Sequence, residues 1–128
     1  MTRPMLERMC PFFIVSDVDQ TLAFYCGKLG FETWRKEPEP KPFFAIVGRD
    51  GAQLFVKAGE AAPLPNAQRD PEMRWDAYVS APDPDALAAD FTGRGAMFSM
   101  PLQDTHDGLR GFEITDPDGH VLFFGRPR

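Results

Sequence analysis

The sequence has few of the residues that form disulfides or bind metal ions. Its 128 residues include two cysteines, Cys10 and Cys26, and two histidines, His106 and His120. The cysteines match no metal-binding or redox spacing, so we expect reduced thiols and a cytoplasmic protein. His106 falls in an expected loop and His120 directly follows an expected turn, so we expect both imidazoles to be solvated.

Long apolar runs and a surplus of positive charge are also missing. No stretch approaches the ~20 apolar residues of a membrane span, and the opening MTRPMLERMC lacks the apolar run of a signal peptide. The net charge of −5 argues against nucleic acid as a partner and favours cationic ligands. The 43% hydrophobic and 26% charged fractions are ordinary for one globular domain.

The first half of the chain has the pattern of a β-α-β-β-β unit. CPFFIVS is strand-like, and the following SDVDQTLAFYCGKLG has apolar residues at helical spacing. Ser16 or Asp17 can cap this helix, and Gly30 stands where a left-handed C-terminal cap is needed. Three more strand-like segments follow, FETWRK, FFAIVG and AQLFVK, and Asp50-Gly51 is the turn signal between the last two.

The second half repeats this order after a proline- and charge-rich stretch. WDAYVS, the helical pattern DPDALAADFTGRG, and the strand-like AMFSM, GFEIT and HVLFFG follow one another. FAIVGRDGAQLF at 44–55 matches FEITDPDGHVLF at 112–123 with six identities in twelve positions. The repeat indicates a duplication within a single domain, 1–128. Module one spans about 9–58, a linker about 59–72, and module two about 73–127.

Two such modules predict an α+β fold in which a curved mixed sheet surrounds a cup. One face of each sheet takes the helix, and the other must meet a partner or curve around a ligand. Side chains along a strand alternate between the two faces of a sheet. Leu54 and Leu122 are therefore expected on one face of their sheets, and Phe55 and Phe123 on the other. Phe12, Phe55 and Phe123 are expected on one face, where they either line the cup or pack at a contact between modules. An apolar concave face is a candidate ligand site or dimerisation surface.

The duplicated order, the opening VSDVDQTLAFYCGKLGFE and the closing RGFEITDPDGHVLFFG resemble the vicinal oxygen chelate superfamily. This superfamily contains glyoxalases, dioxygenases and bleomycin-resistance proteins. The resemblance covers about 9–127 and implies the glyoxalase/bleomycin-resistance fold. Enzymes of the superfamily hold a divalent metal in the cup, with ligands from the first and last strands of each module, and their substrates coordinate its open positions.

The positions that the resemblance assigns to these ligands hold other residue types in this chain. The first-strand position of module one falls on Cys10, and the last-strand position falls near 53–55, where Phe55 is the repeat partner of Phe123. The corresponding positions of module two fall on Trp75 or Asp76, and on Phe123. Cys10 or Asp76 could bind a metal in principle, but the usual histidines and glutamates are missing. We therefore predict no metal and no cofactor, and we favour a protein that is not an enzyme.

The chain is most similar to the bleomycin-resistance branch, whose members sequester a cationic glycopeptide as dimers in aromatic-lined grooves. This similarity implies a homodimer that holds an aromatic or cationic small molecule without catalysis. The candidate ligand-binding residues are Cys10, Phe12, Trp34, Gln53, Phe55, Trp75, Asp76, Arg110 and Phe123. Trp34 is either a stacking platform or a sheet residue at a dimer contact.

Arg110, in DGLRGFEI, distinguishes between an anionic and a cationic ligand. An arginine at the cup would clamp a carboxylate or phosphate and repel a cation, but it can also pair with a neighbouring acid. The acids Asp104, Asp107 and Glu113 either hold a cation or are simply solvated. Two other functions remain open: a superfamily enzyme, with an atypical metal set or acting through Arg110 and a loop acid, and a ligand-free scaffold or regulatory dimer. The sequence also leaves open whether the modules pair within one chain or swap between two.

Overall fold

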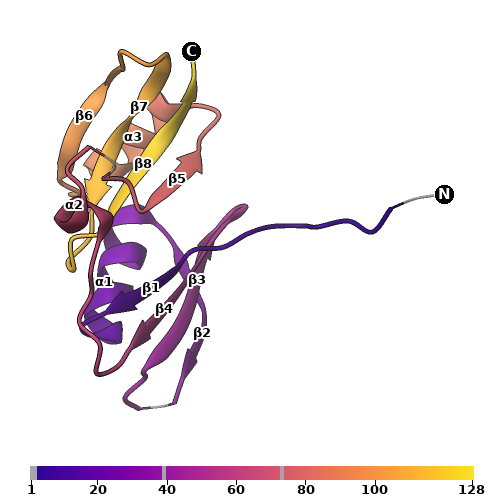
Figure 1. The fold of residues 1–128 in the computed structure, drawn as a ribbon, viewed down its shortest axis with the longest axis vertical. Coiled ribbons are helices and arrows are strands. Elements are labelled where there is room, and N and C mark those ends of the chain that lie inside the picture. The colour runs from indigo at the N-terminus through magenta and orange to yellow at the C-terminus, as the bar shows by residue number, and fades with distance from the viewer. Residues whose placement is uncertain (1–2, 39, 73) are drawn as a thin grey trace.

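The chain folds into two β-α-β-β-β modules that lie end to end (Figure 1). The computed structural model describes residues 3–38, 40–72 and 74–128. Each module contributes one open, four-stranded mixed sheet, which confirms the α+β fold predicted from the sequence. Within the described residues, no helix is long and apolar enough to cross a membrane.

Module one forms its sheet in the strand order β1-β4-β3-β2, with β1 parallel to β4 and the other pairs antiparallel. Its elements are β1 (Phe12–Val15), α1 (Val18–Leu29), β2 (Glu32–Glu37), β3 (Phe44–Arg49) and β4 (Ala52–Ala58). Helix α1 begins where the Asp17 carboxylate accepts a hydrogen bond from the backbone N–H of Gln20. It ends at Gly30, whose φ of 71° is the left-handed conformation that glycine adopts most readily.

Module two repeats this arrangement in the strand order β5-β8-β7-β6, again with one parallel pair, β5 and β8. Its elements are β5 (Ala77–Ser80), α3 (Pro84–Gly93), β6 (Phe98–Asp104), β7 (Leu109–Thr115) and β8 (Val121–Pro127). Asp83 caps α3 by accepting a hydrogen bond from the backbone N–H of Ala86. A short helix, α2 (Asn66–Arg69), lies in the segment expected as a linker.

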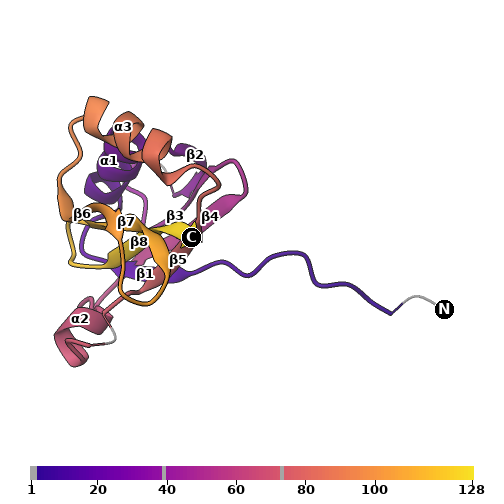
Figure 2. The ribbon, with the colours of Figure 1, turned by 90° about the horizontal axis from the view of Figure 1, so that it is seen from above.

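Each helix covers one face of its own sheet. Figure 2 shows α1 and α3 side by side on one side of the molecule, with β1, β5, β7 and β8 on the other. The residues between helices and sheets form one hydrophobic core that runs through both modules. This core contains Leu22, Tyr25, Leu29, Val47 and Val56 from module one, and Phe91, Phe112, Ile114 and Phe124 from module two.

The turn between β7 and β8 joins module two to module one. Asp116, in this turn, accepts a hydrogen bond from the hydroxyl of Tyr25 on α1, with 2.8 Å between the oxygens. Two residues later, Asp118 accepts hydrogen bonds from the hydroxyl and the backbone N–H of Ser16. Burial, and then the negative charge and hydrogen bond of Asp116, raise the pKa of Tyr25 well above its ordinary value, so this hydroxyl stays a donor.

His120 lies in the same junction. It is 5% exposed, its ring stacks on Phe13 of β1 with centroids 4.2 Å apart, and its Nδ1 lies 3.0 Å from the Asp116 carboxylate. The expectation of a solvated imidazole is therefore wrong for His120, because the turn that carries it packs against β1. Burial lowers the pKa of His120, but the hydrogen bond and charge of Asp116, with the charges of Asp76 and Asp118, outweigh this effect and raise it above 6.5.

We expect the raised pKa of His120 to stabilise the protein more at mildly acid than at alkaline pH. A group whose pKa is raised by folding contributes its full stabilisation below the unfolded value and loses it as the pH rises through the folded value. The free-energy gap between wild type and His120→Gln should thus be largest near about pH 6 and shrink toward about pH 9, by about 1.4 kcal/mol for each pKa unit of elevation. Denaturant unfolding across this range measures the gap.

The variant His106→Gln is the matched control, because His106 is the other histidine and is exposed in the turn before β7. It should unfold with the pH dependence of the wild type. A gap between wild type and His120→Gln that stays constant across this range would contradict the assignment, since it would report only the lost ring contact with Phe13.

Candidate functional site

Each sheet leaves one face uncovered by its helix, and aromatic side chains gather on both uncovered faces. On module one, Phe12, Phe44 and Phe55 form a cluster with ring centroids 5.7 to 6.2 Å apart. They lie on the face opposite α1, because the alternating neighbours Phe13 and Val56 are in the core. Phe12 is 57% exposed, so this cluster presents an apolar surface to solvent.

Trp34 of β2 lies across the same uncovered face. A Cβ atom added to Gly48 of β3 would sit 2.2 Å from the indole ring, a distance that real atoms do not reach. Glycine at this position therefore lets the indole lie close against the backbone of the neighbouring strand. Trp34 is still 47% exposed and continues the aromatic surface toward the edge of the sheet.

The uncovered face of module two carries a stack of three aromatic rings. Phe123 of β8 lies against the backbone of Gly111 and Gly125, where an added Cβ would come within 2.5 and 2.6 Å of its ring. Trp75 stacks on Phe123 with centroids 4.2 Å apart and an interplanar angle of 22°. Tyr78 stacks beside it at 5.5 Å and 24°. Phe123 is fully buried beneath these rings, so Trp75 and Tyr78 form the exposed part of the platform.

A buried carboxylate holds this platform in place. Glu113 of β7 is 5% exposed, and its Oε2 accepts a hydrogen bond of 2.7 Å from the indole N–H of Trp75. Its Oε1 lies 3.1 Å from Nη2 of Arg74, which forms an ion pair with it. Of the two possibilities that the sequence left open for Glu113, a solvated acid is the wrong one. The residue is an anchor on the uncovered face.

The strand registers of the two modules show which residues occupy equivalent positions. Two pairs correspond, Phe12 opposite Phe55 and Tyr78 opposite Phe123. Phe12 of β1 is therefore equivalent to Tyr78 of β5. Cys10 lies two residues before Phe12 and Asp76 two residues before Tyr78, so these two residues are also equivalent. This resolves the choice between Trp75 and Asp76 that the sequence left open.

The four positions that the resemblance assigns to metal ligands do not fit a metal ion. The carboxylate of Asp76 accepts from the backbone N–H groups of Asn66 and Val121, both at 2.8 Å, and so closes a loop. The thiol of Cys10 lies 3.6 Å from the side-chain oxygen of Gln53. The remaining two positions are phenylalanines, which offer no donor atom. Among the described residues, no group of three or more His, Cys, Asp and Glu side chains could hold a metal.

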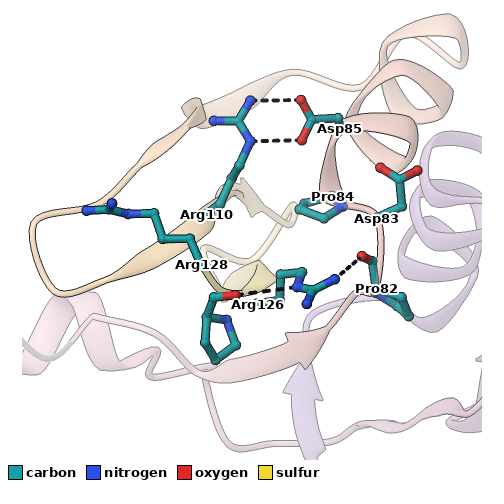
Figure 3. A pocket seen from close by; sticks show the side chains of 8 residues that line it. Pro82, Asp83, Pro84, Asp85, Arg110, Arg126 and Arg128 are labelled. Atoms are coloured by element: carbon teal, nitrogen blue, oxygen red, sulfur yellow. Dashed lines mark hydrogen bonds and ion pairs between the residues drawn. The ribbon is translucent and has the colours of Figure 1, made fainter.

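Arg110 lies on the helix side of its sheet and not on the uncovered face. It borders a small pocket of about 290 Å³ at the beginning of α3, which Figure 3 shows. Its guanidinium donates twice to Asp85 of α3, with both distances 2.8 Å, and once to Asp104 at 3.1 Å. The hydrogen bond and charge of Arg110 lower the pKa of Asp85 despite some opposing desolvation. Arg110 thus pairs with acids and does not reach a ligand on the aromatic faces.

A second hollow lies between the two modules. It is an open groove of about 1190 Å³ that the β3–β4 turn, β5 and the start of α3 border, and its lining includes Cys10, Gln53, Asp76 and Tyr78. Beside it, Arg49 donates to the Asp90 carboxylate and to the carbonyl of Leu29, each at 2.8 Å. The side chains of Arg49 and Asp90 thus pair with each other, and the lining of the groove is mostly apolar.

The residues predicted for the site separate into distinct places. Phe12, Phe55 and Trp34 share one uncovered face, and Trp75 and Phe123 share the other. Cys10, Gln53 and Asp76 border the groove between the modules. Sequence reasoning missed Tyr78 as a member of the platform, although the alternation of the second module's first strand contained that signal.

Comparison with known proteins identifies the fold family. Residues 11–124 match the family described as the glyoxalase/bleomycin resistance protein/dioxygenase superfamily. No curated protein sequence matches the chain.

Several solved structures are similar to the chain over nearly its whole length. TioX from Micromonospora sp. ML1 is 20% identical with a TM-score of 0.72, over 95% of this chain and 100% of that one. A bleomycin-binding protein in complex with bleomycin is 19% identical with a TM-score of 0.73, over 96% and 100%. A bleomycin-binding protein from Streptomyces verticillus, complexed with copper(II)-bleomycin, is 22% identical with a TM-score of 0.67, over 97% and 100%. At these identities the likeness establishes the fold, and together with the family match it shows that the chain belongs to the glyoxalase/bleomycin resistance protein/dioxygenase superfamily.

Proposed function

We propose that this protein binds and sequesters a small molecule, without catalysing a reaction, on the aromatic faces of its two sheets. The observation that carries the proposal is the stack of Trp75 and Tyr78 on Phe123, with glycines beneath it that admit the rings. Phe123 and Phe55 occupy positions where the superfamily's enzymes hold metal ligands, so the chain has aromatic surface where those enzymes have a reaction centre. Flat, rigid rings favour a ligand with a planar aromatic part.

A positive charge on the ligand fits the same surface. The chain carries a net charge of −5, and the buried carboxylate of Glu113 lies directly beside the aromatic stack. Aromatic faces attract cations through the negative potential of the ring. Two of the similar structures are complexes with bleomycin or copper(II)-bleomycin, and this fold-level similarity supports an aromatic, cationic ligand class for this chain.

A homodimer is part of the proposal. Both uncovered faces expose large apolar side chains to solvent, among them Phe12 at 57%, Trp34 at 47% and Tyr78 at 43%. The start of the described chain extends away from the modules (Figure 1), and Met5, Leu6 and Met9 are 78%, 94% and 95% exposed. A second copy that laid its own sheet over these faces would remove this apolar surface from water and enclose a groove for the ligand. The cytoplasmic location expected from the sequence stays a prediction.

The ligand is tested by thermal unfolding of chelator-treated protein, with a bleomycin-type glycopeptide in one arm and zinc, nickel, manganese or iron(II) in the other. We expect a saturable rise in stability with the glycopeptide, about 2.7 kcal/mol at 100 times the dissociation constant, and none with the metals. Trp75→Ala should reduce the affinity at least tenfold, because the half-buried ring that stacks on Phe123 is lost.

Phe24→Ala on α1 is the matched control, because it removes an aromatic side chain that packs on the helix side, against Tyr25. It should lower stability but leave the glycopeptide affinity within about twofold, since a change of that size is small on the scale of one contact. A rise in stability with a metal and none with the glycopeptide would overturn the proposal in favour of an enzyme. A rise in neither arm would leave sequestration of this ligand class without support.

Light scattering after size exclusion tests the dimer. We expect a mass near twice the 14.4 kDa of one chain. Phe12→Lys should shift the population to monomer, because a charge within the proposed interface must be desolvated. Leu64→Lys also places a lysine on an exposed apolar side chain, 60% exposed and distant from β1 in the chain, and it should remain dimeric. A wild-type mass of one chain at every concentration loaded contradicts the dimer.

A further inference from the structure

The surroundings of Glu113 are unusual for a residue that only stabilises the fold. A carboxylate that is 5% exposed lies on the same face as the aromatic stack. Both of its side-chain partners, Arg74 and Trp75, come from the short segment that leads into β5. A carboxylate offers about four acceptor directions, so these two contacts leave capacity for a further donor.

The indole of Trp75 is held rigidly and polarised. Phe123 supports it from beneath at 4.2 Å, and the N–H donates to the Glu113 carboxylate at 2.7 Å. A hydrogen bond to an anion pushes electron density into the ring and strengthens the negative potential of its face. A planar cation would therefore be attracted twice, by the indole face and by the carboxylate beside it.

A planar cation from the chain itself already contacts this carboxylate. The guanidinium of Arg74 lies 3.1 Å from the Glu113 carboxylate, yet its side chain remains 44% exposed. The Arg74 end of the ion pair is open to water, whereas the Glu113 side chain is only 6% exposed and needs a cationic partner. The contact therefore shows a geometry that a guanidinium or amidinium arriving from solvent can adopt, because the arriving cation takes over the pairing with Glu113 as Arg74 moves into water.

We propose that Arg74 is an internal occupant of a cation subsite formed by Glu113 and Trp75, and that an amidinium or guanidinium group of the ligand displaces it. The ligand's ring would then lie over the aromatic platform, and Arg74 would move into solvent. This inference rests on the proposed function and adds to it the charged group that sets specificity. In this proposal Arg74 competes with the ligand for the Glu113 carboxylate and does not contribute to ligand binding.

The test compares two probes of nearly equal shape, naphthalene-2-carboxamidine, which is a cation, and naphthalene-2-carboxamide, which is neutral. Binding is measured by titration followed by Trp fluorescence. Wild type should bind the amidinium more tightly than the amide. Arg74→Ala should tighten amidinium binding by about twofold to fivefold, because the competing guanidinium is removed and its own ion pair is open to water at the arginine end, and it should leave the amide unchanged. Glu113→Gln, which keeps the acceptor for the indole N–H, should abolish the preference.

Arg69→Ala is the matched control, because it removes the same charge from α2, where Arg69 donates to Asn66 instead. It should bind both probes as the wild type does. If Arg74→Ala weakens the amidinium or leaves it unchanged while wild type binds both probes, Arg74 has a structural role and this inference is overturned, but the proposed function stands. If wild type binds neither probe, the aromatic platform is no site for such ligands and both proposals are overturned.

Discussion

The constraint on which the rest of the structure depends is that each four-stranded sheet has two faces and one helix to cover them. Helices α1 and α3 bury one face of each sheet in a core that runs through both modules. The opposite faces must be completed by something outside the module. The chain places aromatic residues there, and it uses Gly48, Gly111 and Gly125 to let the rings lie against the backbone. The aromatic rings on the uncovered faces are therefore held in defined positions by the glycines beneath them.

Polar groups set the geometry around these surfaces. The Asp116 carboxylate fixes the turn of module two against Tyr25 of module one, and the Glu113 carboxylate fixes Trp75 over its sheet. Both are almost fully buried and paired with specific donors, so removing one partner would leave a desolvated charge. The same need for partners explains Asp76, whose carboxylate satisfies two backbone N–H groups. These three acids thus hold loops and rings in position.

The sequence predicted the parts of the fold that depend on local patterns. The duplicated order of elements, the cap at Asp17 and the left-handed Gly30 follow from spacing and residue type alone. The alternation that placed Phe55 and Phe123 on one kind of face also held. The burial of His120 and Glu113 was not accessible in this way, because it depends on which segments from distant parts of the chain pack against them. Arg110 was assigned to the ligand side, although its spacing from Phe112 by two residues places both on the helix side.

The central claim is that the ligand lies on the aromatic faces and not in the helix-lined part of the groove between the modules. Nuclear magnetic resonance of labelled protein, titrated with a bleomycin-type glycopeptide, tests this most directly, because the chain has two tryptophans and both lie on the uncovered faces. The account predicts that the indole signal of Trp75 shifts with the methyl signals of Ile46 on β3. Shifts confined to Val79 and Leu87, which line the groove, would contradict it.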